Sequence, residues 1–229
     1  MNIEHDAVGA AARSAWLAGE VLSVALRVSL RELNARFLGC LRLMPEQELG
    51  YLGFAPTVGR LLQACEIEST LVMAACPYAL FDAAFRQHEC WQAICSSPGT
   101  PPREAASATS GPAEYLAEYD ALTEMALFFA WHLATTNALA TRLVLGMSSA
   151  TAELIRSSTL PTIAGATRAR RRLLRPRWPQ RTLFWRRLLT ITAQSSQEEA
   201  TTAQLMGIQL MATEERLEEL AAAPAARRR

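Results

Sequence analysis

The sequence predicts an all-α protein that consists of two tandem helical units in a pseudo-symmetric arrangement, followed by a C-terminal helix. Three observations lead to this fold class. Apolar residues recur at helical spacing, one stretch rich in Pro, Gly and Ser divides the chain, and short apolar steps on its two sides match at a constant offset. With 229 residues and a hydrophobic content of 50%, the chain is long enough to bury packed cores.

Each half opens with a long amphipathic helix. In the first half, apolar side chains three and four residues apart form one stripe, which comprises Leu26, Leu30, Leu33, Phe37, Leu41 and Met44. Pro45 follows and is expected to end the helix. In the second half, the same spacing connects Tyr115, Tyr119, Leu122, Ala126, Phe129 and Leu133.

Hydrophobic periodicity stops in the middle of the chain, where Pro, Gly and Ser crowd together in SSPGTPPREAASATSGP. This composition is typical of a linker. The predicted organisation is therefore a first helical unit at 1–97, a linker at 98–112, a second, arginine-rich helical unit at 113–194, and a C-terminal helix and tail at 195–229.

The two halves share their apolar steps at an offset of about 93 residues. Leu52-Gly53-Phe54 falls on Leu145-Gly146-Met147, and one inserted residue later Trp91 falls on Trp185. Each glycine, followed within three residues by Pro or Ser, indicates a helix end and a new helix start. Chance likeness between two Leu- and Ala-rich segments is the alternative, but the shared order favours an internal repeat whose copies pair with each other.

The last segment is predicted to form a helix that docks on the core or on a partner. Ser196 and Glu199 have the spacing of a capping box. Leu205, Ile208, Met211 and Leu217 supply its apolar positions, and its end is acidic, with Glu214, Glu215, Glu218 and Glu219.

Charge is divided unequally between the halves, although the formal net charge is only +1. The first 99 residues contain seven Arg against ten acidic residues, whereas no Asp or Glu occurs from Leu154 through Gln197. The second half instead carries an arginine segment, which comprises Arg168, Arg170, Arg171, Arg172, Arg175, Arg177, Arg181, Arg186 and Arg187.

Such a segment predicts an anionic partner. Guanidinium groups suit phosphate oxygens and guanine edges, and the interleaved Trp178, Phe184 and Trp185 anchor the segment to the core or stack on bases. The nine arginines are therefore the predicted DNA-binding residues. Two alternatives stay open: pairing with the acidic final helix or an acidic partner, and a solvated face that only keeps the helix soluble.

A group of aromatic and apolar side chains is expected to form the core of the first helical unit. The group comprises Tyr78, Leu80, Phe81, Phe85 and Trp91. The alternative is that some of these side chains dock a partner.

No catalytic site is predicted, because none of the three histidines accompanies a nucleophile motif, and no P-loop, Rossmann glycine pattern or zinc-protease motif occurs. His132, inside an apolar helix, is expected to be a core histidine. The five cysteines lack the spacing of a metal site, so neither a metal nor a cofactor is expected. Without a membrane-length apolar run or an export signal, the expected location is cytoplasmic, with no membrane partner and no small-molecule substrate.

One pattern within the second half, ALATRLVLGMSSATAELIRSSTLPTIAGATRARRRLLRPRW, resembles the flagellar master-regulator subunit FlhD and related activators carried by conjugative elements. In that family, a long helix leads through a Leu-Gly-hydrophobic step to two shorter helices separated by a Leu-Pro turn, and then to an extended segment. The matching parts here are Leu145-Gly146-Met147, Ala150–Ser157, Leu160-Pro161, Thr162–Ala169 and Leu173–Trp178. The first half repeats the step at Leu52-Gly53-Phe54 and the extended segment at Tyr78–Phe85.

The resemblance implies a ligand-free helical transcription activator that acts on promoter DNA in a hetero-oligomer with a second, FlhC-like regulator subunit. In the family, much of the DNA contact belongs to that partner. Two departures affect the stoichiometry: the family member is a single unit of about half this length, and the first half has Ile67-Glu68 in place of the Leu-Pro turn. The alternative function is a protein-interaction adaptor of a secretion or flagellar system that does not contact DNA.

Overall fold

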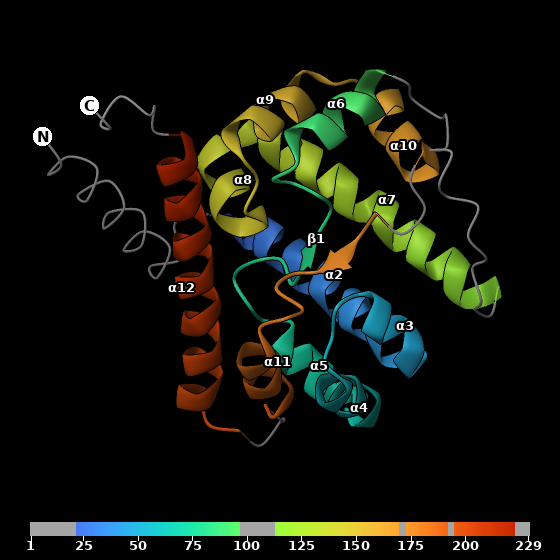
Figure 1. Cartoon of the computed structure of the whole chain (residues 1–229), viewed down its shortest axis with the longest axis vertical. Coiled ribbons are helices and arrows are strands. Elements are labelled where there is room, and N and C mark those ends of the chain that lie inside the picture. Colours follow the sequence, from blue (N-terminus) through green and yellow to red (C-terminus); the bar gives the residue numbers. More distant parts are fainter. Residues whose placement is uncertain (1–21, 97–112, 170–172, 192–194, 223–229) are drawn as a thin grey trace, which may run out of the picture.

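The computed structural model describes residues 22–96, 113–169, 173–191 and 195–222, and these ranges are mostly helical (Figure 1). Within them, one pair of two-residue strands is the only sheet. The predicted all-α class is therefore confirmed. The linker predicted at 98–112 lies outside the described residues.

The elements follow the same order in the two halves. The first half contains α2 (Val24–Leu43), α3 (Glu46–Tyr51), α4 (Pro56–Ala64), α5 (Ile67–Met73), β1 (Phe81–Asp82) and α6 (His88–Ser96). The second half contains α7 (Ala113–Thr136), α8 (Ala138–Leu145), α9 (Ser149–Ser157), α10 (Leu160–Ala169), β2 (Arg175–Pro176) and α11 (Thr182–Leu189). A long final helix, α12 (Gln197–Ala222), follows.

The helix ends lie where the glycine steps predict them. Gly53 (φ +94°) follows α3, and Gly146 (φ +66°) caps α8; both adopt the left-handed conformation that glycine tolerates best. The next helices begin with Pro56 in the first turn of α4 and with Ser148 as the N-cap of α9. These boundaries confirm the reading of both steps as a helix end and a new start.

The two extended segments pair with each other as an antiparallel ribbon, in which Phe81 faces Pro176 and Asp82 faces Arg175. Each strand leads into a turn that contains a non-glycine residue at positive φ, Ala84 at 56° and Trp178 at 52°. Neither the pairing nor the strained turns could be read from the sequence, since both depend on contacts between the halves.

A tryptophan fixes each turn against the helix that follows it. The indole of Trp91 donates to the carbonyl of Ala83, and that of Trp185 donates to the carbonyl of Arg177, both at 3.0 Å. The turn and the helix after it are therefore held in the same way in both halves.

The last helix of each half packs against the other half. α6 contacts α9 and α10, α11 contacts α4, and the long helices α2 and α7 contact each other (Figure 1). Because of this exchange, the two predicted units share one continuous core. Two paired copies would have such an arrangement, but duplication and pseudo-symmetry stay predictions.

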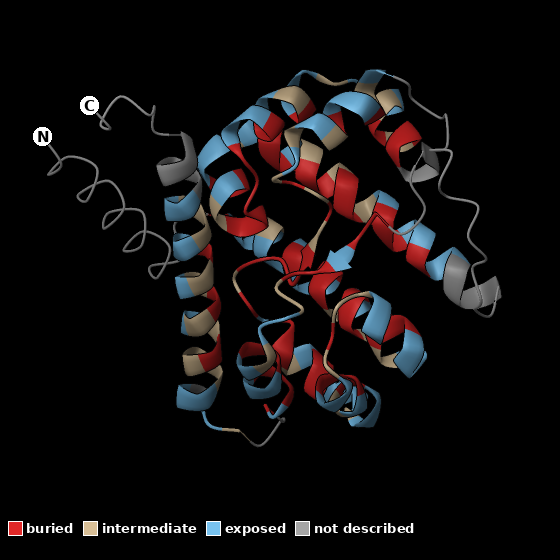
Figure 2. Cartoon of the chain, in the orientation of Figure 1, coloured by how far each residue is buried: buried red, intermediate tan, exposed pale blue. Residues whose placement is uncertain are grey.

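The core runs through the middle of the molecule, between the helices and the ribbon (Figure 2). Tyr78, Leu80, Phe81, Phe85 and Trp91 are all fully buried, which confirms their predicted core role. Phe54 and Trp185 meet edge to face, with ring centroids 5.0 Å apart, and so join the two halves.

The prediction that His132 is a core residue is wrong, because its side chain is exposed. The next residue along α7, Leu133, is buried, and one step along a helix turns a side chain through about 100°. An apolar sequence neighbourhood therefore did not place this position on the buried face.

In the part of the chain that the structure describes, no helix combines the length and the apolar character needed to span a bilayer.

Candidate functional site

Helix α11 presents arginines on the surface while its other face is buried. Phe184, Trp185, Leu188 and Leu189 face the core, whereas Arg186 and Arg187 are exposed, as is Arg181 just before the first turn. We call Arg181, Arg186 and Arg187 the α11 arginines. Among the residues that the structure describes, none of the three is paired with a carboxylate, so their guanidinium groups are accessible to an external anion.

The equivalent helix of the first half lacks these charges. An offset of 94 residues aligns Trp91 with Trp185 and therefore places Gln92 and Ala93 opposite Arg186 and Arg187. Gln92 and Ala93 are exposed as well. The two helices thus share a buried tryptophan but present different chemistry to solvent.

An apolar side chain lies beside the exposed arginines. Leu183 is 70% exposed and precedes Arg186 by three residues and Arg187 by four, which places all three on one side of α11. An apolar side chain makes no contact with phosphate oxygens, so Leu183 contributes nothing to phosphate binding. An exposed leucine beside arginines is instead typical of a surface that binds a protein.

The remaining predicted DNA-binding residues are divided between described and undescribed parts of the chain. Arg175 lies in β2 and is exposed. Arg168 belongs to α10, but its side chain lies outside the described residues, as do Arg170, Arg171 and Arg172. The DNA-binding prediction for these five arginines stays a prediction.

Arg177 differs from the others because its side chain is only 5% exposed. Its Nη2 lies 3.5 Å from Oε2 of Glu214 on α12, its Nη1 donates to the carbonyl of Val144 at 3.4 Å, and its guanidinium carbon lies 4.5 Å from the ring centroid of Trp178. This residue matches the alternative in which the arginine segment pairs with the acidic final helix. We therefore leave Arg177 out of the proposed DNA surface.

Burial lowers the pKa of Arg177, while the nearby carboxyl groups of Glu214 and Asp82 raise it. A guanidinium keeps its proton throughout the physiological range. Arg177 is therefore a buried cation that needs an acid close by, and α12 supplies one.

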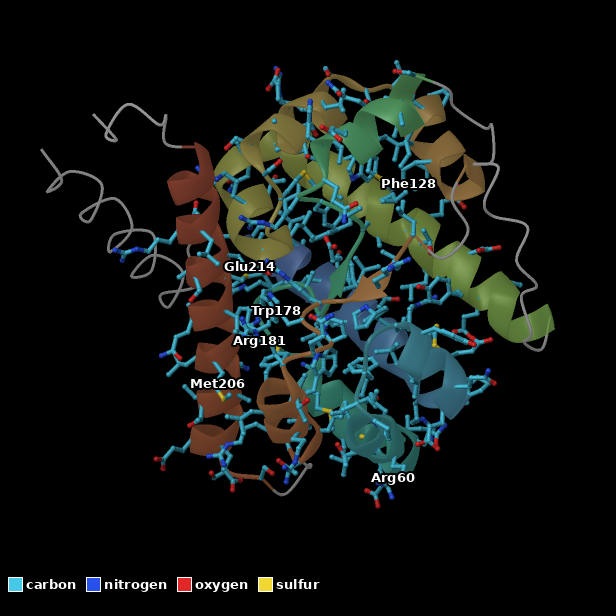
Figure 3. All side chains as sticks on the ribbon, viewed as in Figure 1. Arg60, Phe128, Trp178, Arg181, Met206 and Glu214 are labelled. Carbon is cyan, nitrogen blue, oxygen red and sulfur yellow. The ribbon has the colours of Figure 1, made fainter. Side chains whose placement is uncertain are left out.

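Glu214 is the point at which α12 holds the ribbon. Its Oε1 accepts a hydrogen bond of 2.7 Å from the indole of Trp178, and its backbone carbonyl accepts one of 2.9 Å from Nη2 of Arg86. Figure 3 shows Glu214 and Trp178 side by side between α12 and the core, with Arg181 close to them. One turn of α12 thus meets both halves of the protein, since Arg86 belongs to the first and Trp178 to the second.

The buried face of α12 differs in part from the predicted one. Ala203, Gly207 and Met211 are buried, whereas Leu205 and Leu217 are exposed. The reason is close approach, because a Cβ on Gly207 would overlap the hydroxyl of Tyr78. The capping box is confirmed: Ser196 N donates to Glu199 Oε2, and Glu199 N donates to Ser196 Oγ.

Two residues at this contact, Arg86 and Gly207, escaped the sequence interpretation, and Gly146 was predicted only as a helix end. Arg86 lies in the acidic half, where the charge count drew no attention to a single arginine. The glycines are needed for close approach, since a Cβ on Gly146 would overlap Nη2 of Arg177. A mid-helix glycine at Gly207, inside an otherwise helix-favouring segment, was the available indication.

Within the described ranges, no group of three or more His, Cys, Asp or Glu side chains is arranged to hold a metal ion. No disulfide bond joins the five cysteines, all of which lie in described ranges: Cys40 and Cys76 are buried, and the other three are partly buried. Comparison of the chain with models of protein families, with curated proteins and with solved structures finds no match.

Proposed function

We propose that this chain is a subunit of a transcription activator that binds promoter DNA together with a second regulator protein, with the α11 arginines in contact with phosphate. One observation carries the proposal. α11 is fixed by a buried tryptophan and presents Arg186 and Arg187 outward, and no described carboxylate pairs with either of them.

The firm attachment of α11 to the core favours phosphate binding by its exposed arginines. A guanidinium on a well-anchored helix loses less conformational freedom on binding than one on a loose segment, and its fork of N–H donors fits two phosphate oxygens. Phosphate contacts position a protein on the duplex without reading its sequence. The α11 arginines would therefore supply affinity and register, while the second subunit reads the promoter.

The resemblance to FlhD supports the same role, because members of that family act with a different subunit on promoter DNA. It also decides how the proposal is tested. Since much of the DNA contact in the family belongs to the partner, binding is measured on the assembled complex, obtained by co-purification with the products of neighbouring genes.

The test compares two double variants of equal charge. Arg186→Gln with Arg187→Ala gives α11 the residues that α6 carries at the equivalent positions, without touching the buried face. Arg36→Gln with Arg156→Gln removes the same charge from α2 and α9, where each arginine already pairs with a glutamate. We expect the first variant to bind promoter DNA roughly tenfold more weakly at physiological salt, and the control variant to bind like wild type.

Unchanged promoter binding by the α11 variant in the assembled complex contradicts the proposal. An equal loss in both variants contradicts it as well, because it assigns the effect to overall charge. Far-UV circular dichroism of each variant checks that the helices are intact.

The exposed Leu183 favours the second candidate function, a protein-interaction adaptor of a secretion or flagellar system. In that case, the α11 arginines receive an acidic partner, and the leucine packs against it. The Arg186/Arg187 double variant then loses a co-purifying protein and shows no DNA phenotype. Pull-down and DNA binding on the same variant therefore separate the two functions.

A further inference from the structure

A pocket of about 410 Å³ opens beside the ribbon, where the two halves and α12 meet. Its walls come from the ends of α3 and α8, from the turns that follow β1 and β2, and from Glu214. Its volume lies within the range of small-molecule sites. The pocket is therefore built from segments of all three parts of the chain.

Five charged side chains line this pocket: Asp82, Arg86, Arg175, Arg177 and Glu214. Three guanidinium groups thus face two carboxyl groups, which leaves one positive charge in excess when all are ionised. The strand pairing creates this set, because Asp82 and Arg175 are partners across the ribbon.

Two of the five charged side chains that line the pocket, Asp82 and Arg86, already make hydrogen bonds within the protein. Both carboxyl oxygens of Asp82 accept backbone N–H groups of its own turn, from Ala84 at 3.2 Å and Phe85 at 3.0 Å. Arg86 donates to the carbonyls of Gly146 and Glu214. These two side chains therefore shape the wall of the pocket.

Arg177 and Glu214 each keep one polar atom without a hydrogen bond. Nη2 of Arg177 and Oε2 of Glu214 are buried, lie 3.5 Å apart, and find no hydrogen-bond partner among the described residues. These two atoms form a long ion pair with each other, and neither makes a hydrogen bond, which a ligand with a matching acceptor and donor would add.

Arg175 is the remaining charged side chain of the pocket. It lines the same pocket, its side chain is exposed, and it is paired with no carboxylate in the described part of the chain. A ligand carboxylate placed between Arg175 and Arg177 would neutralise the excess positive charge. A donor next to that carboxylate would meet the carboxyl group of Glu214, whose side chain is 30% exposed.

We propose that this pocket binds a small organic acid that carries a hydrogen-bond donor on the carbon beside its carboxylate, that is, an α-hydroxy or α-amino acid. The carboxylate contacts Arg175 and Arg177, and the hydroxyl or ammonium group contacts Glu214. The site departs from the ligand-free protein that the resemblance implies. It is independent of the proposed DNA role, because the α11 arginines do not line the pocket.

The test is isothermal titration calorimetry on the full chain with four probes: glycolate, glycine, acetate and inorganic phosphate. We expect glycolate or glycine to bind with a dissociation constant in the millimolar range or below, and acetate, which has no donor, to bind at least roughly tenfold more weakly. The Arg175→Gln variant is expected to bind the preferred probe at least roughly tenfold more weakly. Because Arg175 is exposed, this substitution leaves the core intact.

Arg181→Gln is the matched control, since it removes the same charge from a neighbouring exposed position outside the pocket. Its affinity for the preferred probe should equal that of wild type. The proposal is overturned if neither glycolate nor glycine binds, if acetate or phosphate binds as tightly as both, or if Arg175→Gln binds like wild type. None of these measurements uses DNA, so their failure leaves the α11 proposal untouched.

Discussion

Glu214 of α12 places its Oε2 3.5 Å from Nη2 of Arg177, which is almost completely buried behind it. The same carboxylate accepts the indole N–H of Trp178 through its other oxygen. The final helix thus supplies the acid for a buried cation of the ribbon. This contact explains why one arginine of a strongly basic segment faces inward.

Replacing Glu214 by Gln should destabilise the fold, because Arg177 would remain buried without its counter-charge. Loss of one partner of a buried ion pair costs about 3 to 5 kcal/mol. Since the side chain of Glu214 is 30% exposed, we expect a smaller loss, roughly 2 kcal/mol, in the free energy of unfolding measured by urea denaturation.

The neighbouring Glu215 provides the control. Its ion pair with Arg142 is 41% exposed on both sides, so Glu215→Gln should cost less than about 1 kcal/mol. Equal losses from the two substitutions would show that Glu214 has no special part in holding α12.

Gly146→Ala should also lower stability, by roughly 1 to 3 kcal/mol. The residue adopts a φ of +66°, and the added methyl would overlap the Arg177 guanidinium. Gly50→Ala, inside α3 with open space around the new methyl, should instead stabilise by roughly 0.5 to 1 kcal/mol. Thermal unfolding of both variants checks the signs, and a neutral Gly146→Ala would contradict the close approach.

Gly207→Ala should release α12 while the rest of the fold stays intact, because the methyl would overlap Tyr78. Hydrogen exchange followed by mass spectrometry should show loss of protection in α12 and retained protection in α2 and α7. Gln209→Ala, on the exposed side of α12, is the control and should leave the exchange of α12 unchanged. Protection of α12 in the Gly207→Ala variant would refute this mode of docking.

Cys40 and Cys76 should resist alkylation in the folded protein. Burial raises the pKa of each thiol to about 12, from an ordinary value of 9.0. The reactive thiolate is therefore roughly a thousandfold scarcer at pH 8 than in a thiol of ordinary pKa, and it becomes plentiful only as the pH rises toward 12. Mass spectrometry after brief iodoacetamide treatment at pH 8 should find both residues unmodified in native protein and modified in urea; rapid modification in native protein would contradict their burial.

Local chemistry made much of this fold predictable. The glycine steps at Gly53 and Gly146, the Pro45 that follows α2 and the Ser196–Glu199 capping box each act through their own neighbours, so the helix ends follow from short stretches of sequence. The extended segments were also located. Their pairing was not, because Phe81 and Pro176 are brought together only by the packing of distant helices.

The sequence does not predict which residues of the arginine segment are exposed and which are buried. Arg175 and Arg177 are two residues apart in nearly identical surroundings, yet one is exposed and the other is buried. Arg177 is the one that contacts Glu214, which is 37 residues further along the chain. The α11 arginines were easier to place, because Phe184 and Trp185 mark the buried face of that helix.

The salt dependence of promoter binding tests the central claim most directly. Each phosphate contact adds about 0.9 to the slope of log binding constant against log salt concentration. For the assembled complex, measured by fluorescence anisotropy across a salt series, we predict that Arg186→Gln with Arg187→Ala lowers the slope by roughly 2. A slope equal to that of wild type would contradict the claim that α11 contacts the DNA backbone.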